Sequence, residues 1–187
     1  MVLNTHYILI LDDSGSMKGQ NWTNAKNGAL KCIKSIMNQT LAKISVIIFN
    51  QDARIVVECQ KPVLQEISRK IQYKGGNTQF EPPFQKALTL IEKYQNFDKI
   101  QILFYTDGHA GYPENIINQF NLLPVEIRQI INLVACSGET ISNSLALIIE
   151  KFQTHMQNAE LRNAVLPVDL STVWTEVVSQ NFHNQLV

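Results

Sequence analysis

The sequence contains little charge. Charged residues make up 17% of its 187 residues, against about 25% in an average soluble protein. Lys plus Arg and Asp plus Glu each number 16, so the formal net charge is zero. Binding to nucleic acid or to a membrane surface is normally accompanied by a basic excess, so neither partner is expected. Long apolar runs are also missing, and a membrane-spanning helix needs 18 or more such residues.

Cysteine is scarce and widely spaced. Cys32, Cys59 and Cys136 form no Cys-x-x-Cys pair, which argues against a disulfide framework and against a zinc site. Residues 1–7 carry neither a basic segment nor a small-residue cleavage site, so we expect no secretion signal. Free thiols are typical of a reducing compartment, and we therefore expect a cytoplasmic, intracellular protein.

The sequence does contain a regular alternation of apolar runs and helical patterns. Short apolar runs between turn residues predict buried strands, and apolar residues three or four positions apart predict helices. The expected strands are 7–11, 44–49, 53–57, 100–105, 127–134 and 164–167. The expected helices are 21–39, 62–71, one that starts at Pro82 or Pro83 and reaches 91, 113–120, 141–152 and 171–181. Asp169 or Ser171 is the expected cap of the last helix.

This order of elements predicts an α/β fold of the Rossmann-like, doubly wound type. We expect a mostly parallel, six-stranded sheet with helices on both faces. The turn at residues 50–52 would make the strand that follows it an antiparallel edge strand. Because no linker, repeat or low-complexity segment interrupts the pattern, residues 1–187 are expected to form a single domain.

Oxygen-bearing side chains follow the expected strands where these strands end. In open α/β sheets, ligands bind beyond the carboxyl ends of the strands, near the point where the strand order reverses. The candidates are Asp12, Ser14 and Ser16 after the first strand, Thr78 in a glycine-containing loop, and Asp107 after the strand at 100–105. Carboxylate and hydroxyl oxygens select hard cations, Mg²⁺ first and Mn²⁺ or Ca²⁺ next. The alternative for the first three residues is a capping cluster for the following helix.

The same elements resemble those of a von Willebrand factor type A domain, over nearly the full length of the chain. The matching segments are 8–17 (ILILDDSGSM), 44–50 (ISVIIFN), 75–78 (GGNT) and 103–108 (LFYTDG). In that family these segments build the metal-ion-dependent adhesion site, and none of its elements is missing here. The resemblance implies that Ser14, Ser16 and Thr78 contact Mg²⁺ directly. It implies that Asp12 and Asp107 act mainly through water or through hydrogen bonds to the hydroxyls.

The resemblance predicts a Mg²⁺-dependent protein-interaction module and not an enzyme. A protein partner would supply an Asp or Glu carboxylate that completes the coordination of the metal. The plain ending of the first motif at Met17 looks more like intracellular members of the family than like integrins or collagen-binding members. The chain could belong to a larger protein or complex, and its partner is not identified by the sequence.

Two other functions stay open on the sequence. A metal-independent structural scaffold would bind its partners through helix faces. A Mg²⁺-dependent phosphohydrolase of the haloacid-dehalogenase type also places a nucleophilic Asp after the first strand, but it needs a second acid two residues later. That position is Ser14, which argues against this chemistry. Asp13 is a further acid of the motif, and alternation should point it away from the metal, at a surface turn or behind the ligands.

Overall fold

The computed structural model describes residues 3–138, 142–156, 158–163 and 167–183. The strands are β1 (Thr5–Asp12), β2 (Lys43–Phe49), β3 (Ala53–Gln60), β4 (Lys99–Thr106), β5 (Ile131–Ser137) and β6 (Ala159–Asn163). The helices are α1 (Gln20–Ile36), α2 (Leu64–Lys70), α3 (Glu81–Lys93), α4 (Glu114–Asn121), α5 (Val125–Ile130), α6 (Asn143–Met156) and α7 (Pro167–His183). A short 3-10 turn, η1 (Gly15–Met17), follows β1.

The strands form one mixed sheet with the order β3-β2-β1-β4-β5-β6. All neighbouring strands are parallel except β2 and β3, which form the antiparallel pair at one edge. The predicted fold class is therefore confirmed: a Rossmann-like, mostly parallel sheet of six strands with one antiparallel edge strand. The order reverses between β1 and β4, because β1 is followed by β2 on one side and has β4 on its other side.

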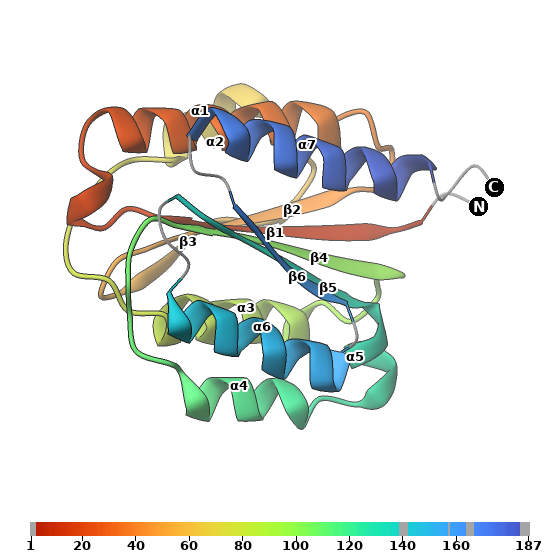
Figure 1. Cartoon of the computed structure of the whole chain (residues 1–187). Helices are drawn as coiled ribbons and strands as arrows, with labels where there is room; N and C mark the ends of the chain where they lie inside the picture. Colours follow the sequence, from red (N-terminus) through yellow and green to blue (C-terminus); the bar gives the residue numbers. More distant parts are fainter. Residues whose placement is uncertain (1–2, 139–141, 157, 164–166, 184–187) are drawn as a thin grey trace.

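Helices cover both faces of the sheet (Figure 1). Helices α1, α2 and α7 lie on one face, with α1 packed along α7. The core on that side includes Tyr7, Leu9 and Leu11 of β1 together with Trp174 of α7. Trp174 is fully buried, as expected for a residue that docks the last helix on the sheet.

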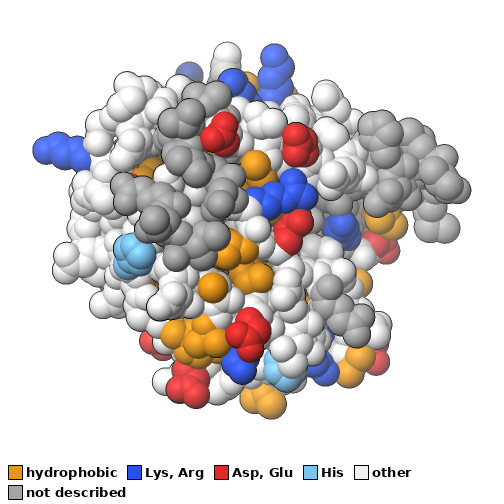
Figure 2. All heavy atoms as spheres, viewed as in Figure 1, with side chains coloured by type: hydrophobic (Ala, Val, Ile, Leu, Met, Phe, Trp, Pro, Cys, Tyr) orange, Lys and Arg blue, Asp and Glu red, His pale blue; other side chains and the backbone are white. Residues whose placement is uncertain are grey.

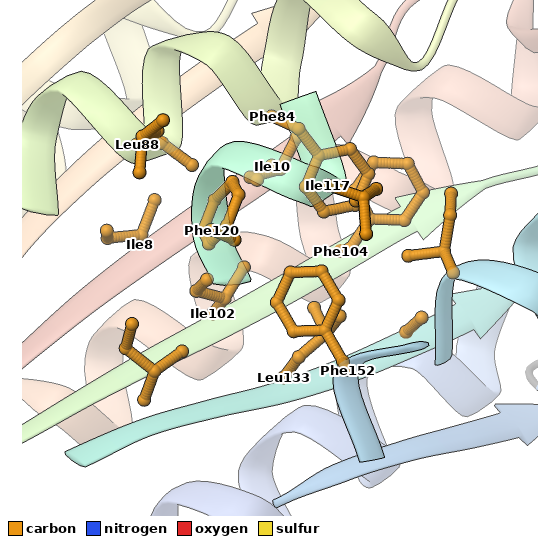
Figure 3. Close-up of a cluster of buried hydrophobic side chains, with 14 of the residues drawn as sticks. Ile8, Ile10, Phe84, Leu88, Ile102, Phe104, Ile117, Phe120, Leu133 and Phe152 are labelled. Atoms are coloured by element: carbon orange, nitrogen blue, oxygen red, sulfur yellow. The ribbon is translucent and has the colours of Figure 1, made fainter. Parts of the chain in front are cut away.

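Helices α3, α4 and α6 cover the opposite face and enclose a core rich in phenylalanine (Figure 3). The Phe84 and Phe104 rings are stacked with their centroids 5.2 Å apart, and Phe120 lies 5.2 Å from Phe152. Phe80 is 1% exposed and contacts Phe104 edge-on, so its side chain belongs to the core. These rings pack α3, α4 and α6 against the sheet face, next to the carboxyl ends of β1 and β4.

Three predicted boundaries near the C-terminus are wrong. The strand predicted at 127–134 begins only at Ile131, because residues 125–130 form α5 with Pro124 as its N-cap. The strand predicted at 164–167 is β6, which ends at Asn163; residues 164–166 lie outside the described part of the chain. Helix α7 already begins at Pro167, which suits the first turn of a helix. Asp169 and Ser171 therefore lie inside the helix and do not cap it. Residue 141, the predicted start of the preceding helix, is also outside the described residues.

The three cysteines are free thiols, as expected. Cys32 and Cys136 are buried, and burial raises the pKa of the Cys136 thiol to about 12. None of the described helices is both long and apolar enough to cross a bilayer.

Candidate metal centre

The candidate site lies where β1 and β4 end, at the reversal of the strand order. Leu11 of β1 is paired with Tyr105 of β4, so the next residues along the two strands, Asp12 and Thr106, are neighbours. Asp12 is the last residue of β1, and Asp107 directly follows β4. Parallel pairing thus brings together two carboxylates that are far apart in the sequence.

Hydrogen bonds fix both oxygens of the Asp12 carboxylate. The Ser14 backbone amide donates to Oδ1 at 2.7 Å, and the Thr106 hydroxyl donates to Oδ2 at 2.5 Å. The side chain is fully buried. Burial raises the pKa of Asp12 to about 6, with a smaller contribution in the same direction from the nearby Asp107. When it is ionised, the Asp12 carboxylate is fixed in its orientation and poorly solvated. A nearby cation would therefore stabilise its negative charge.

The serine hydroxyls connect the two carboxylates. Ser14 Oγ lies 3.1 Å from Ser16 Oγ, and the Ser16 hydroxyl donates to Asp107 Oδ1 at 2.8 Å. These serines do not cap the following helix, because α1 begins at Gln20 with Gly19 as its N-cap. The capping interpretation is therefore wrong for this chain.

The Thr78 hydroxyl reaches the same place from the loop between α2 and α3. A Cβ atom built on Gly108 would lie 3.1 Å from Thr78 Oγ1 and 3.7 Å from Asp12 Oδ2. Both oxygens therefore border the small space beside Gly108. All five predicted site residues, Asp12, Ser14, Ser16, Thr78 and Asp107, thus gather at one end of the sheet.

Asp13 points away from these residues, as alternation along the strand predicts, but it does not lie on the surface. Its side chain is fully buried and forms an ion pair of 2.7 Å with Arg54. Of the two positions expected for Asp13, the surface turn is wrong, and the place behind the predicted ligands is the one that the structure has. Sequence reasoning also missed the partners Arg54 and Asn50, which hold the loop that carries Thr78. The only signal for them was their position in the β2–β3 hairpin, Asn50 in the turn and Arg54 near the start of β3.

The described residues contain no cluster of three or more His, Cys, Asp or Glu side chains suited to hold a metal. The candidate centre is built differently, since three of its five members are hydroxyl residues. A hydroxyl-rich oxygen set with two carboxylates suits a hard divalent cation and not zinc.

One prediction concerns Gly76, which shapes the loop before Thr78. Its φ angle is +135°, and a Cβ atom there would lie 2.1 Å from Gln51 Oε1, the acceptor of the Asn77 amide hydrogen bond at 2.7 Å. Gly76→Ala should therefore break that bond and destabilise the protein by about 1–3 kcal/mol in a denaturant titration. Gly111→Ala is the matched control, because a Cβ atom on Gly111 meets nothing within 4 Å. Equal stability of the two variants would contradict the prediction.

Comparison with known proteins gives the family. The model of the von Willebrand factor type A domain matches residues 7–109. This is more than half of the chain, so the protein belongs to the von Willebrand factor type A domain family.

Solved structures share the fold at low sequence identity. A von Willebrand factor type A protein from Catenulispora acidiphila superposes with a TM-score of 0.78 at 13% identity, covering 95% of this chain and 42% of that chain. The PilB minor pilin from Streptococcus sanguinis superposes with a TM-score of 0.76 at 11% identity, covering 96% of this chain and 61% of that chain. At such identities the likeness shows the fold alone.

A curated relative is an uncharacterized protein from Methanocaldococcus jannaschii. It is 29% identical over 117 residues, which represent 61% of this chain and 26% of that protein. The match thus spans about a quarter of the length of this relative.

Proposed function

We propose that this domain is a Mg²⁺-dependent protein-interaction module that binds an Asp or Glu carboxylate of a protein partner. Domains of this family commonly serve as interaction modules. The observation that carries the proposal is the hydrogen-bonded series from Asp12 through Ser14 and Ser16 to Asp107 at the reversal point of the sheet. The Thr78 hydroxyl lies beside it.

The residues of the site have two roles: some orient the site and supply negative charge, and others would contact the metal. Both Asp12 oxygens already accept hydrogen bonds, so this carboxylate is oriented behind the serines and contributes mainly charge. The hydroxyls of Ser14, Ser16 and Thr78 are neutral oxygen donors that suit Mg²⁺, with Mn²⁺ or Ca²⁺ as alternatives. A cation held there, with only two carboxylates around it, would supply an electropositive position open to a carboxylate from outside.

A binding role fits the site better than catalysis. Ser14 occupies the position where a phosphotransferase of the haloacid-dehalogenase type needs an acid, and its backbone amide and hydroxyl are engaged with Asp12 and Ser16. We therefore propose a non-enzymatic module. The phosphohydrolase alternative would be revived by Mg²⁺-dependent turnover of a generic phosphate ester.

The surface fits a protein partner better than a nucleic acid or a membrane. On the face of the molecule in Figure 2, basic and acidic side chains are scattered among uncharged ones. The formal net charge is zero, and recognition of phosphates would favour a concentrated basic patch. The three free thiols support the proposal of an intracellular, reducing setting.

The test is a calorimetric titration of Mg²⁺ into the wild type and into Asp107→Ala. We expect saturable binding in the wild type and none in the variant, because the variant loses the acceptor of the Ser16 hydroxyl and one of two negative charges. Asp52→Ala is the matched control, since Asp52 is an exposed carboxylate in the β2–β3 turn. Equal heats, or no heat, in wild type and Asp107→Ala would refute the metal site.

Affinity capture with Mg²⁺ or with EDTA then tests the partner. Under the proposal, capture by the wild type needs Mg²⁺ and is lost in Asp107→Ala. A partner retained in EDTA and by Asp107→Ala would favour the metal-independent scaffold instead.

A further inference from the structure

The loop that presents Thr78 is irregular, yet it is tied down at several points. Residues 71–79 connect α2 and α3 without helix or strand. Gly75 and Gly76 both adopt positive φ angles, so the backbone of this loop turns in ways that other residues resist. A loop of this kind would sample many conformations unless other parts of the chain held it.

The buried Asp13 carboxylate lies at the centre of the hydrogen bonds that hold this loop in place. Its Oδ2 atom accepts hydrogen bonds from Arg54 Nη2 at 2.7 Å and from the Lys74 amide at 2.9 Å. Its Oδ1 atom accepts a hydrogen bond from Asn50 Nδ2 at 3.1 Å. Asp13 thus joins the first motif, the β2–β3 hairpin and the loop in one network.

Asn50 and Arg54 also form hydrogen bonds directly with the backbone of the loop. Arg54 Nη2 donates to the Gln72 carbonyl at 2.7 Å, and Asn50 Nδ2 donates to the Gly75 carbonyl at 2.8 Å. The Asn50 carbonyl accepts from the Gln79 amide at 3.0 Å. The loop is therefore fastened on both sides of Thr78.

We infer that Asp13, Asn50 and Arg54 form a clamp that orders the Thr78 loop before any metal binds, and thereby sets the affinity of the site for Mg²⁺. A loop that must be ordered during binding lowers affinity by the free energy of ordering, whereas a preordered loop avoids that cost. The three clamp residues are positioning residues, because their side chains hold the loop and the ligating hydroxyls belong to others. The link to Mg²⁺ rests on the proposed function, but the ordering of the loop does not.

The location of Arg54 indicates that this residue holds the Thr78 loop and contributes little to the stability of the whole domain. Arg54 lies on the edge strand β3, its side chain is 33% exposed, and it belongs to neither hydrophobic core. Its loss should therefore loosen the loop more than the sheet. Arg54→Met keeps the apolar stem and removes the guanidinium.

The test compares amide hydrogen exchange in the metal-free proteins, followed by NMR. The Lys74 amide donates to the Asp13 carboxylate and the Gly75 amide donates to the Asp13 backbone carbonyl. In Arg54→Met, we expect both amides to exchange at least tenfold faster, while amides of β1 and β4 keep their wild-type rates. The dissociation constant for Mg²⁺ should rise about tenfold. Arg54→Lys, which keeps a charged donor, should recover part of both effects.

Two further variants keep the test decisive. Lys93→Met breaks an ion pair to Glu58 on the same strand without touching the loop, and it should change neither measurement. If Arg54→Met does not fold because Asp13 is left as an unpaired buried charge, the double variant Asp13→Asn/Arg54→Met removes both charges and should show the same fast exchange in the loop.

The outcomes that overturn the inference are distinct from failure of the metal site. Wild-type exchange at Lys74 and Gly75, or equal acceleration in β1 and the loop, would show that there is no clamp. A loosened loop with unchanged Mg²⁺ affinity would overturn its link to metal binding. If the wild type itself takes up no Mg²⁺, the proposed function fails, and the exchange rates alone still decide whether the loop is clamped.

Discussion

Asp12→Asn is expected to make the metal-free domain more stable at pH 7 and to abolish its stabilisation by Mg²⁺. In the wild type, burial raises the pKa of Asp12 to about 6 from its ordinary value of 3.8. A carboxyl group whose pKa is raised on folding adds stability below the unfolded pKa and loses it as the pH rises through the folded pKa. At pH 7 the buried ionised carboxylate therefore lowers the free energy of unfolding, and the neutral amide of Asn does not carry this cost.

The size of the effect follows from the same shift. About two pKa units correspond to roughly 3 kcal/mol, which is the upper limit for the gain in metal-free stability on substitution. In the wild type, Mg²⁺ at a hundred times its dissociation constant should contribute about 2.7 kcal/mol. That corresponds to a rise of about 5–10 °C in Tm for a domain of this size. Asp12→Asn should show no such rise.

Thermal unfolding at pH 7, with EDTA or with Mg²⁺, measures both effects at once. Asp52→Asn removes an exposed carboxylate at the same edge of the sheet and should retain the response to Mg²⁺ without a gain in metal-free stability. A variant Asp12→Asn that is less stable than the wild type in EDTA would contradict the argument from burial. A variant that still responds to Mg²⁺ would exclude Asp12 from the site.

The strands that position the site could be predicted from the sequence because each is a continuous apolar run. β1, β2 and β4 are buried along nearly all of their length, so their composition differs sharply from that of their surroundings. The rule that parallel strands end at one edge of the sheet then brought Asp12 and Asp107 together. Thr78 is a candidate from its glycine-containing loop, but its place beside the two carboxylates came only from the resemblance, because the chain between α2 and α3 has no periodic pattern.

The elements that could not be predicted carry weak or ambiguous local patterns. Ile127, Ile130 and Ile131 suit a helix as well as a strand, and Pro124 decides for the helix by starting α5. The edge strand β6 is short and includes Glu160 and Arg162, which an apolar-run criterion passes over.

The partners that allow Asp13 to be buried were not predictable for a different reason. A charged residue next to a turn belongs on the surface unless a partner is present, and its partner Arg54 lies 41 positions away in the sequence. Long-range ion pairs leave no periodic signal, so the network that fastens the loop became visible only in three dimensions.

His6 is expected to make the domain sensitive to acid. This histidine of β1 is fully buried between the Tyr94 and Phe97 rings, and burial lowers its pKa to about 4 from 6.5. Its Nε2 atom lies 2.8 Å from Ser45 Oγ, whereas Nδ1 has no partner among the described residues. The unfolded chain takes up a proton at this residue near pH 6.5 and the folded chain does not, so stability should fall as the pH drops from 6.5 to 4.

The expected loss is about 3 kcal/mol at pH 4 relative to pH 7, because each pKa unit corresponds to 1.36 kcal/mol. The measurement is the difference in unfolding free energy between wild type and His6→Gln at each pH, which cancels the opposite contribution of Asp12. His6→Gln keeps a polar side chain that can pair with Ser45 but does not titrate, so the wild type should lose stability relative to it as the pH falls. His109→Gln replaces an exposed loop histidine, leaves the buried imidazole in place, and should follow the wild type. Parallel pH profiles for wild type and His6→Gln would show that His6 takes up its proton equally in both states, and that this end of β1 is open to water.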